Sequence, residues 1–476
     1  MLHHALFERA LGHASRYRDM LDQRSPWPAL TGAALKSRFE GPTPERGEDG
    51  VAVIDALVAA AEPGLSGAAG SRFFGWVIGA SHPVGVAADM LTSAWGQNAG
   101  NHVCSPSAAL AEQAAARWML DILRLPPECS MGFVTGATMA SFTCLAAARN
   151  AVLARGGWNV EADGLTGAPA VRIFLGDDAH ATIWCALRYL GFGSRATRIP
   201  TDDNGRMDAE ALATALAAGE GPAIVIAQAG QINTGAFDPF VAIARACRAH
   251  GAWMHVDGAF GLWARAVREL DPLTEGLDEA DSWSTDGHKW LQLPYDSGFA
   301  IVRDEVAHRR AMSIVASYLP PEGDEIYDPG QRVPELSRRA RGFAAWAMLR
   351  ALGREGVTAM VRRHCALARR LAYRLASEPG VTVVNAVVLN QLIVAFGDGS
   401  GSQGDAATTA VIARLEHEAV CLAGGAVWRG RRVLRLSIIS APLTETDVDR
   451  LADAVLAAWR HVSADLLPIP AIGAQP

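Results

Sequence analysis

The sequence between residues 223 and 257 reads AIVIAQAGQINTGAFDPFVAIARACRAHGAWMHVD. Two short apolar runs, residues 223–227 and 252–256, flank a segment at 239–250 with a helical pattern. Short apolar runs bounded by turn residues are typical of buried strands, and strands that alternate with helices indicate parallel pairing. The stretch therefore predicts one strand–helix–strand unit of an α/β sheet that helices cover on both faces.

The same alternation continues outward on both sides of this unit. A further apolar run lies at 171–175, and helical patterns lie at 139–154, 180–190 and 208–218. Upstream, Ser105-Pro106 predicts the start of a helix, because serine caps helices and proline suits the first helical position. The residues spaced four apart in that helix predict its buried stripe: Leu110, Ala114, Trp118 and Ile122.

The C-terminal part of the chain has a different pattern. Helices are expected at 338–353 and 356–377, followed by strand-like runs at 381–384, 392–396 and 433–438 and by helices near 406–418 and 444–460. This pattern predicts a smaller α+β domain. We therefore expect an N-terminal helical segment over 1–104, a large α/β domain over 105–337, the small domain over 338–465 and a tail over 466–476.

Composition excludes several classes of protein. The chain has 476 residues, with 43 Lys or Arg and 50 Asp or Glu, and half of its residues are hydrophobic. Disordered chains are poor in hydrophobic residues, so disorder is excluded. The formal charge of −7 argues against a protein that tracks nucleic-acid phosphates, which is usually strongly basic.

Cysteines and the N-terminus bear on location. The seven cysteines are scattered, with no Cys-x-x-Cys pair, which fits a reducing compartment and neither a disulfide framework nor a metal site. The N-terminus lacks a basic stretch followed by an apolar one, so no signal peptide is expected. The uncharged stretches at 73–88 and 90–111 contain polar residues and prolines that a membrane span would not carry. We expect a soluble cytoplasmic protein.

Lysine is nearly absent from this chain. Of the 43 basic residues only Lys36 and Lys289 are lysines. Lysine can lose its proton and attack a carbonyl, whereas arginine stays protonated. Lys36 is interpreted as a solvated surface charge, and Lys289, in Asp286-Gly-His-Lys-Trp290, as a candidate imine-forming residue.

Two other segments complete a possible site, since open α/β sheets bind ligands at the carboxyl ends of their strands. Gly136, Ala137 and Thr138 precede a helix, where small residues and N-terminal amides suit a phosphate. Asp257 ends a predicted buried strand, where a carboxylate needs a partner. Singly, the glycine turn could merely pack a helix on the sheet, and Asp257 could merely cap a turn. With Lys289 they meet the requirements of pyridoxal 5′-phosphate (PLP).

At these positions the sequence resembles the PLP-dependent group II amino-acid decarboxylases, in particular the aromatic-L-amino-acid decarboxylase-like members, as an atypical bacterial branch. The resemblance covers about residues 70–350, and five motifs follow the family's order: 177–180, 203–208, 233–239, His255-Val-Asp257 and 286–290. It implies PLP fold-type I (aspartate aminotransferase-like), with a mostly parallel sheet in a PLP-binding domain over 105–337. It also implies a homodimer with active sites at the interface, to which residues 1–104 contribute.

The resemblance implies a role for each matching residue. Lys289 would form the Schiff base with PLP, and Asp257 would pair with the ring nitrogen. His180 would stack on one face of the ring and Ala259 would pack on the other. The residues expected around the phosphate are Gly136, Ala137, Thr138 and His288, with Asp286 beside them. The alternatives are that His180 merely caps its helix and that His288 is a core histidine.

The resemblance places a proton donor at Tyr318, 29 residues after Lys289, in a stretch that turns from apolar to acidic and Pro-rich. A tyrosine there implies amine release, whereas a phenylalanine implies oxygen-dependent aldehyde formation. The alternative is a tyrosine that only packs. Trp76, Val77 and Ile78 resemble the family's substrate-pocket segment, although a core strand at the dimer interface is equally compatible with them.

Three positions depart from the family pattern. Gly230-Gln231-Ile232 stands where many members have Gly-Thr-Thr, Gly287 replaces the usual proline, and Met139 replaces a polar residue. For this reason substrate identity does not carry over. The catalytic residues expected are Lys289, His180, Tyr318 and Asp257, and no metal is expected.

The predicted function is α-decarboxylation of an L-amino acid, aromatic or bulky and apolar, to its amine and CO2. The alternatives on the same cofactor are an aldehyde synthase, a transaminase or a carbon–carbon lyase. In a transaminase Arg435 would hold the substrate carboxylate, although an ordinary strand arginine is the simpler interpretation. A silent regulatory homologue would have been expected to lose Lys289 or Asp257, and both are present.

Overall fold

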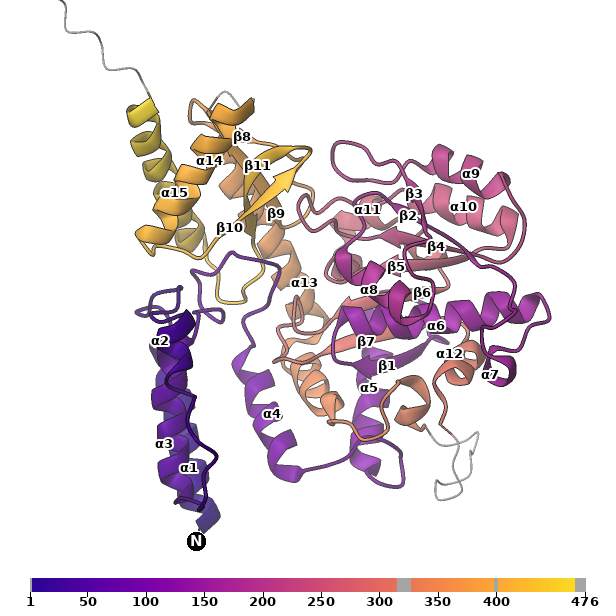
Figure 1. Cartoon of the computed structure of the whole chain (residues 1–476), viewed down its shortest axis with the longest axis horizontal. Coiled ribbons are helices and arrows are strands. Elements are labelled where there is room, and N and C mark those ends of the chain that lie inside the picture. Colours follow the sequence, from indigo (N-terminus) through magenta and orange to yellow (C-terminus); the bar gives the residue numbers. More distant parts are fainter. Residues whose placement is uncertain (1, 315–326, 398–400, 467–476) are drawn as a thin grey trace, which may run out of the picture. The chain divides into compact units, whose positions relative to one another are not determined.

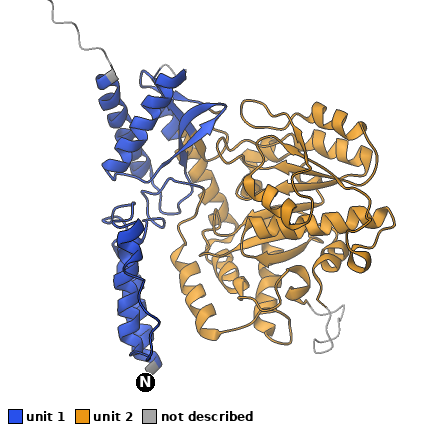
Figure 2. Ribbon diagram, viewed as in Figure 1, with its two compact units in different colours: residues 1–76, 370–384, 393–476 blue, residues 77–369, 385–392 orange. Residues whose placement is uncertain are grey.

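The computed structural model describes residues 2–314, 327–397 and 401–466. The chain forms two compact units, which Figure 2 colours separately. The larger unit comprises residues 77–369 and 385–392, and the smaller unit comprises residues 1–76, 370–384 and 393–476. Tyr318 lies outside the described residues.

A seven-stranded sheet forms the centre of the larger unit within the described residues (Figure 1). Its strand order is β1-β7-β6-β5-β4-β2-β3. β7 pairs antiparallel with both of its neighbours, and the other pairs are parallel. The predicted mostly parallel sheet is thereby confirmed. The strands are β1 (Ser130–Val134), β2 (Arg172–Gly176), β3 (Thr197–Ile199), β4 (Ala223–Gln228), β5 (Trp253–Asp257), β6 (Ser282–Asp286) and β7 (Gly298–Val302).

Helices connect these strands. They are α4 (Pro83–Trp95), α5 (Pro106–Ile122), α6 (Ala137–Arg155), α7 (Val160–Asp163), α8 (Ala181–Tyr189), α9 (Ala209–Ala217), α10 (Phe240–His250), α11 (Asp271–Thr274) and α12 (Glu305–Met312). Short 3-10 turns lie at Gly261–Ala266, Arg268–Leu270, Leu277–Glu279 and Pro329–Arg332. α13 (Arg341–Ala376) contains a break at Gly353, whose φ is +60°.

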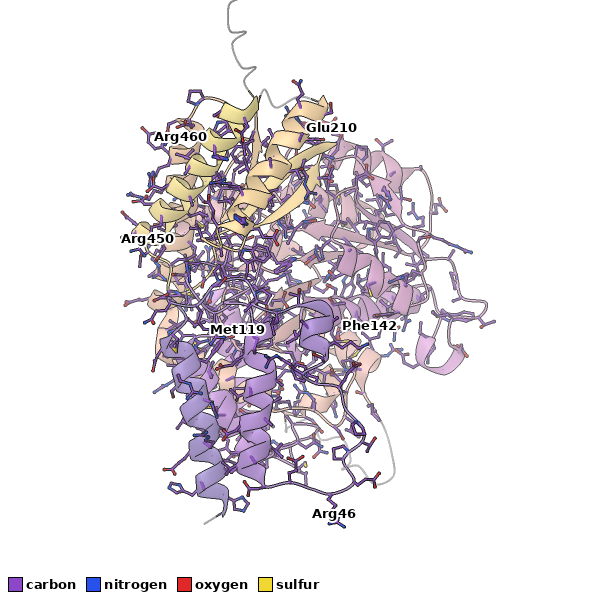
Figure 3. The ribbon with its side chains drawn as sticks, turned by 60° about the vertical axis from the view of Figure 1, so that its left-hand side comes forward. Arg46, Met119, Phe142, Glu210, Arg450 and Arg460 are labelled. Carbon is purple, nitrogen blue, oxygen red and sulfur yellow. The ribbon has the colours of Figure 1, made fainter. Side chains whose placement is uncertain are left out.

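α6 is the central helix of the core. It packs against β5, β6 and β7 and against α8 and α12. Its small residues Ala140, Cys144 and Ala147 are fully buried, so the helix lies close to the sheet. Phe142, labelled in Figure 3, is partly buried and packs against the same core. This burial holds the N-terminus of α6 at one edge of the sheet.

α5 corrects one prediction. The stripe from Leu110 to Ile122 was expected to be buried, but Leu110 is 52% exposed. The buried face instead contains Met119, labelled in Figure 3, and Glu112, whose carboxylate pairs with Arg338 at 2.8 Å. Glu112 is the only polar residue among the described buried residues of α5, and its pairing with Arg338 allows a charged side chain on an otherwise apolar face.

The smaller unit combines the two ends of the chain. Its helices are α1 (Leu2–Asp19), α2 (Gly32–Lys36), α3 (Gly50–Ala61), a 3-10 turn at Glu62–Gly64, α14 (Gly401–His417) and α15 (Glu445–Leu466). A four-stranded sheet has the order β10-β11-β9-β8, with bounds Gly424–Trp428, Arg431–Ser437, Gln391–Phe396 and Val381–Val383. Phe74 joins the two ends, since its N–H donates to Leu422 O (2.8 Å) and its carbonyl accepts from Ser437 N (3.0 Å).

The two units divide the chain differently from the predicted boundaries after residues 104 and 337. Residues 77–104 and 338–369 belong to the larger unit, and residues 1–76 group with the C-terminal sheet. In the described ranges, no helix combines the length and apolar character that a membrane crossing requires.

Candidate active site

A cavity of about 300 Å³ lies in the larger unit, at the carboxyl ends of the strands. Residues that end or follow β1, β2, β4, β5 and β6 line it, as expected for an open α/β sheet. All nine residues predicted to contact the cofactor are among them: Gly136, Ala137, Thr138, His180, Asp257, Ala259, Asp286, His288 and Lys289. The sequence order and the topology thus bring three distant motifs to one place.

Lys289 lies in the turn that follows β6. Its Nζ is 2.9 Å from Asp286 Oδ2, and its side chain is 16% exposed. Gly287 shapes this turn because its N–H donates to Ser297 O at 3.0 Å and because a side chain there would overlap Ser297 Oγ. A proline could not make that hydrogen bond. The turn geometry therefore accounts for the glycine in place of the usual proline.

His288 is held on three sides. Its Nδ1 accepts from Ser297 N–H (3.3 Å), which leaves the proton on Nε2, 3.3 Å from Asp286 Oδ1. The Tyr295 ring lies 4.3 Å from the imidazole, centroid to centroid. Burial lowers the pKa of His288, partly opposed by the nearby Asp286 carboxylate. His288 therefore faces the cavity as a neutral hydrogen-bond donor.

Asp257 is the buried carboxylate at the end of β5, and it is 6% exposed. Its Oδ1 accepts from Ala259 N–H at 3.1 Å. Burial raises its pKa, while the positive charges available on His180 and Lys289 act in the opposite direction. A cation placed against this carboxylate would relieve the cost of its burial.

His180 does cap its helix, which was the structural alternative. Its Nδ1 accepts from Thr182 N–H at 3.3 Å and lies 2.7 Å from Thr182 Oγ1. The residue also lines the cavity. The cap fixes the ring at the cavity wall, so the capping role and a role in the site are compatible.

The N-terminus of α6 borders the cavity. Ala137 N–H donates to Asp286 Oδ1 at 2.6 Å. A Cβ on Gly136 would lie 3.2 Å from both Asp286 Oδ1 and His288 Cε1, so this turn has room only for a small residue. Backbone amides at a helix N-terminus favour an anion, which here is the Asp286 carboxylate.

The predicted substrate segment, Trp76 to Ile78, does not line the cavity as the structure describes it. Val77 is 2% exposed and Trp76, in the smaller unit, is 60% exposed. The next residues contact the lysine turn, since Gly79 N–H donates to His288 O (3.0 Å) and Ala80 N–H to Gln292 Oε1 (2.7 Å). Arg435 lies in β11 of the smaller unit.

Several lining residues had no role assigned to them from the sequence. They are Thr135, Thr182, Gln228, Gly230, Ile232 and Phe260. Lys289 Nζ lies 5.9 Å from the Phe260 ring centroid. Gln231 is buried, and its Oε1 accepts from Asn233 N–H (2.6 Å) and Thr234 N–H (3.1 Å). The next residue, Ile232, lines the cavity. Phe260 follows the end of β5 by three residues, and this closeness to Asp257 in the sequence could have predicted that it lines the cavity.

Comparison with known proteins agrees with this geometry. Residues 34–396, well over half of the chain, match the family model described as the pyridoxal-dependent decarboxylase conserved domain. An aromatic-L-amino-acid decarboxylase of Bacillus atrophaeus is 28% identical over 327 residues, which are 67% of this chain and 66% of that protein. The chain thus spans just under two thirds of that relative.

A second relative and a solved structure extend the comparison. An L-2,4-diaminobutyrate decarboxylase of Rhizobium meliloti (strain 1021) is 29% identical over 379 residues, which are 78% of this chain and 74% of that protein. The structure of Oryza sativa TDC with PLP and tryptamine superposes with a TM-score of 0.89 over 96% of this chain and 97% of that one, at 22% identity. The fold is that of the PLP decarboxylases. The chain therefore belongs to the pyridoxal-dependent decarboxylase family, whose members are PLP-dependent carboxy-lyases.

Proposed function

We propose that this chain catalyses the α-decarboxylation of an L-amino acid, aromatic or bulky and apolar, to its amine and CO2. One observation carries the proposal: Lys289, the buried carboxylate of Asp257 and the N-terminus of α6 line the same cavity of about 300 Å³. When bound, PLP supplies an electron sink for the electron pair that CO2 leaves behind.

The donor set fits PLP, and each group has a role that its surroundings support. Lys289 would hold the cofactor through Nζ, as the only lysine among the residues that line the cavity. Asp257 would keep a proton on the ring nitrogen, since a buried carboxylate with a raised pKa favours a cationic partner. His180 and Ala259 would flank the ring. Gly136, Ala137 and Thr138 would receive the phosphate at the helix N-terminus.

The aromatic or bulky apolar substrate class rests on the resemblance of Trp76, Val77 and Ile78 to the family's substrate-pocket segment. Ile232 and Phe260 contribute apolar surface to the cavity, and no arginine occurs among the described residues that line it. The named relatives act on aromatic amino acids and on diaminobutyrate, so the family alone does not decide the substrate.

Amine release requires a proton donor to the carbon that loses CO2. We assign this role to Tyr318, because the resemblance places it there and a phenol can act as a general acid. Tyr318→Phe is expected to keep CO2 release and, with O2 as the oxidant and water as co-reactant, to shift the product from amine to aldehyde, ammonia and peroxide. The described residues do not include it.

The experiment that tests the function is a panel of L-amino acids with CO2, amine and ammonia measured separately. CO2 with an equal amount of amine supports the proposal. Ammonia with peroxide would instead assign an aldehyde synthase. Consumption of a keto acid without CO2 would assign a transaminase, and an aldehyde released from the substrate side chain without CO2 would assign a carbon–carbon lyase.

We also propose a homodimer in the cytoplasm. Large apolar side chains that are 37–68% exposed gather within one segment of the larger unit, which supports a protein interface. They are Val84, Met90, Leu91, Trp95, Val103 and Leu110. The seven cysteines are all free thiols, which supports a reducing location. Sedimentation velocity of Trp95→Glu, compared with wild type, tests the interface: the variant is expected to shift toward monomer.

A further inference from the structure

We infer that Asp286 is an internal anion that competes with the cofactor phosphate for the N-terminus of α6 and thereby limits the affinity of the protein for phosphate-bearing ligands. The inference rests on the proposed placement of the phosphate at Gly136, Ala137 and Thr138. It goes beyond that placement because it assigns Asp286 a role opposed to cofactor binding.

The contacts of Asp286 carry the argument. The residue is 3% exposed, and its Oδ1 accepts the Ala137 N–H at 2.6 Å. Its Oδ2 lies 2.9 Å from Lys289 Nζ, and Oδ1 lies 3.3 Å from His288 Nε2. Both oxygens therefore have partners that carry positive charge or a hydrogen-bond proton. Asp286 satisfies the first amide of α6 as an anionic cap would.

Two of these partners are groups that the cofactor must engage. The Ala137 amide is the backbone donor on which the phosphate placement depends, and Lys289 Nζ is the amine that must bond to the cofactor. A nitrogen committed to a carbon–nitrogen double bond keeps fewer N–H donors for Asp286. A phosphate dianion at the α6 N-terminus would also stand beside a buried carboxylate of like charge. A bound phosphate must therefore displace the Asp286 carboxylate from the Ala137 N–H, whereas the N–H that Lys289 keeps can still donate to Asp286.

The substitution Asp286→Asn separates this role from a purely structural one. The amide has nearly the same shape but carries no charge, and its NH2 group can donate to a phosphate. Loss of the contacts to Lys289 and Ala137 should lower the thermal stability of the ligand-free protein. Removal of the competing charge should raise its affinity for phosphate. A structural role alone predicts loss in both measurements.

The experiment measures binding to the cofactor-free, full-length protein by calorimetry, with inorganic phosphate, PLP and pyridoxal as separate ligands. We expect Asp286→Asn to lower the Kd for inorganic phosphate and for PLP by roughly tenfold or more. The Kd for pyridoxal, which has no phosphate, should change much less. Asp296→Asn is the matched control, because it removes the same charge from an exposed carboxylate in the loop between β6 and β7, which pairs with Arg341. The charge of Asp296 acts on His288 only weakly compared with that of Asp286, so the phosphate Kd should change much less than in Asp286→Asn.

Two results would overturn the inference. One is a phosphate Kd in Asp286→Asn equal to or higher than in wild type, and Asp286→Ser provides the same comparison if the asparagine variant does not fold. The other is an equal decrease in the Kd for pyridoxal, which would show that the charge of Asp286 does not act on the phosphate. Gly136→Leu distinguishes the underlying proposal: if it leaves phosphate binding intact, the phosphate lies elsewhere and both ideas fail. Weakened binding in Gly136→Leu with no gain in Asp286→Asn refutes only the inference.

Discussion

At the scale of single residues, the scarcity of lysine helped to identify the candidate imine-forming residue. Lys36 pairs with Glu40 at 3.2 Å and is 69% exposed, which confirms its interpretation as a solvated surface charge. Lys289 lines the cavity together with all the other residues proposed to hold the cofactor. What the sequence could not supply is the ion pair between Lys289 and Asp286, because two residues three apart in a turn meet only if the turn has the right shape.

The first prediction concerns Lys289→Arg. Turnover and the absorbance of the protein-bound imine should both be lost, because a guanidinium matches the charge of lysine but not its nucleophilicity. Absorption spectra of the PLP-treated variant measure the imine. Circular dichroism that matches wild type would show that the fold is intact. Wild-type absorbance and turnover in the variant would remove Lys289 from the mechanism.

The second prediction concerns Asp257→Asn. The amide keeps the shape and the contact to Ala259 N–H but cannot hold a proton on a ring nitrogen. We expect cofactor binding to persist while kcat falls by on the order of 10²-fold or more. Titration with PLP and steady-state kinetics at saturating cofactor separate the two quantities. Unchanged kcat would show that Asp257 has only a structural role.

At the scale of elements, the sequence predicted many of the helices and the strands β2, β4, β5, β8, β9 and β11, but not β1, β3, β6, β7 and β10. β6 reads Ser282-Trp-Ser-Thr-Asp286 and was not expected as a strand, yet it is fully buried. Its polar groups are satisfied by partners distant in sequence, such as Ser141 Oγ to Ser284 Oγ at 2.9 Å. Gly353 interrupts α13 between the two predicted helices, because a φ of +60° suits glycine.

The third prediction concerns Asp238, which ties the end of β4 to the preceding loop. Its carboxylate accepts from Gln228 N–H (2.7 Å) and Met207 N–H (2.8 Å), and burial raises its pKa from 3.8 to about 7. Between pH 3.8 and about 7, Asp238 is therefore protonated in the folded state and ionised in the unfolded state. Stability should therefore fall as pH rises from about 4 to about 7.

Urea unfolding of the cofactor-free protein across this range measures the effect against Asp238→Asn. The free energy of unfolding of wild type minus that of the variant should fall with rising pH, by on the order of a few kcal/mol, and level off above pH 7. Asparagine does not titrate, so other groups cancel in the difference. If the difference between the two free energies of unfolding stays constant or rises with pH, burial does not raise the pKa of Asp238.

At the scale of the whole molecule, the sequence did not predict how the two ends of the chain combine. Residues 1–76 join the C-terminal sheet through backbone contacts such as Leu422 N–H to Arg72 O at 2.9 Å. Such contacts connect segments about 350 residues apart and leave no periodic signal in either one. The α5 face with exposed Leu110 is a similar case, because its apolar residues match an interface as well as a core.

The last prediction concerns the proposed homodimer, in which the resemblance implies that Tyr318 of one chain serves the site of the other. Lys289→Ala and Tyr318→Ala chains should each form no amine alone. In a hybrid dimer with shared sites, one site lacks both residues and the other is intact. Random mixing should then restore about a quarter of the wild-type amine-forming activity.

The matched control is wild type mixed with the double variant Lys289→Ala, Tyr318→Ala. Shared sites predict that these hybrids form no amine, because each site then lacks one residue, whereas sites within one chain predict one intact site per hybrid. Chains with two different affinity tags, purified in sequence, isolate the hybrids and allow amine release to be measured on them directly. Isolated hybrids of the two single variants that form no amine, together with active hybrids in the control, would place Lys289 and Tyr318 in the same chain's site and remove the requirement for a dimer.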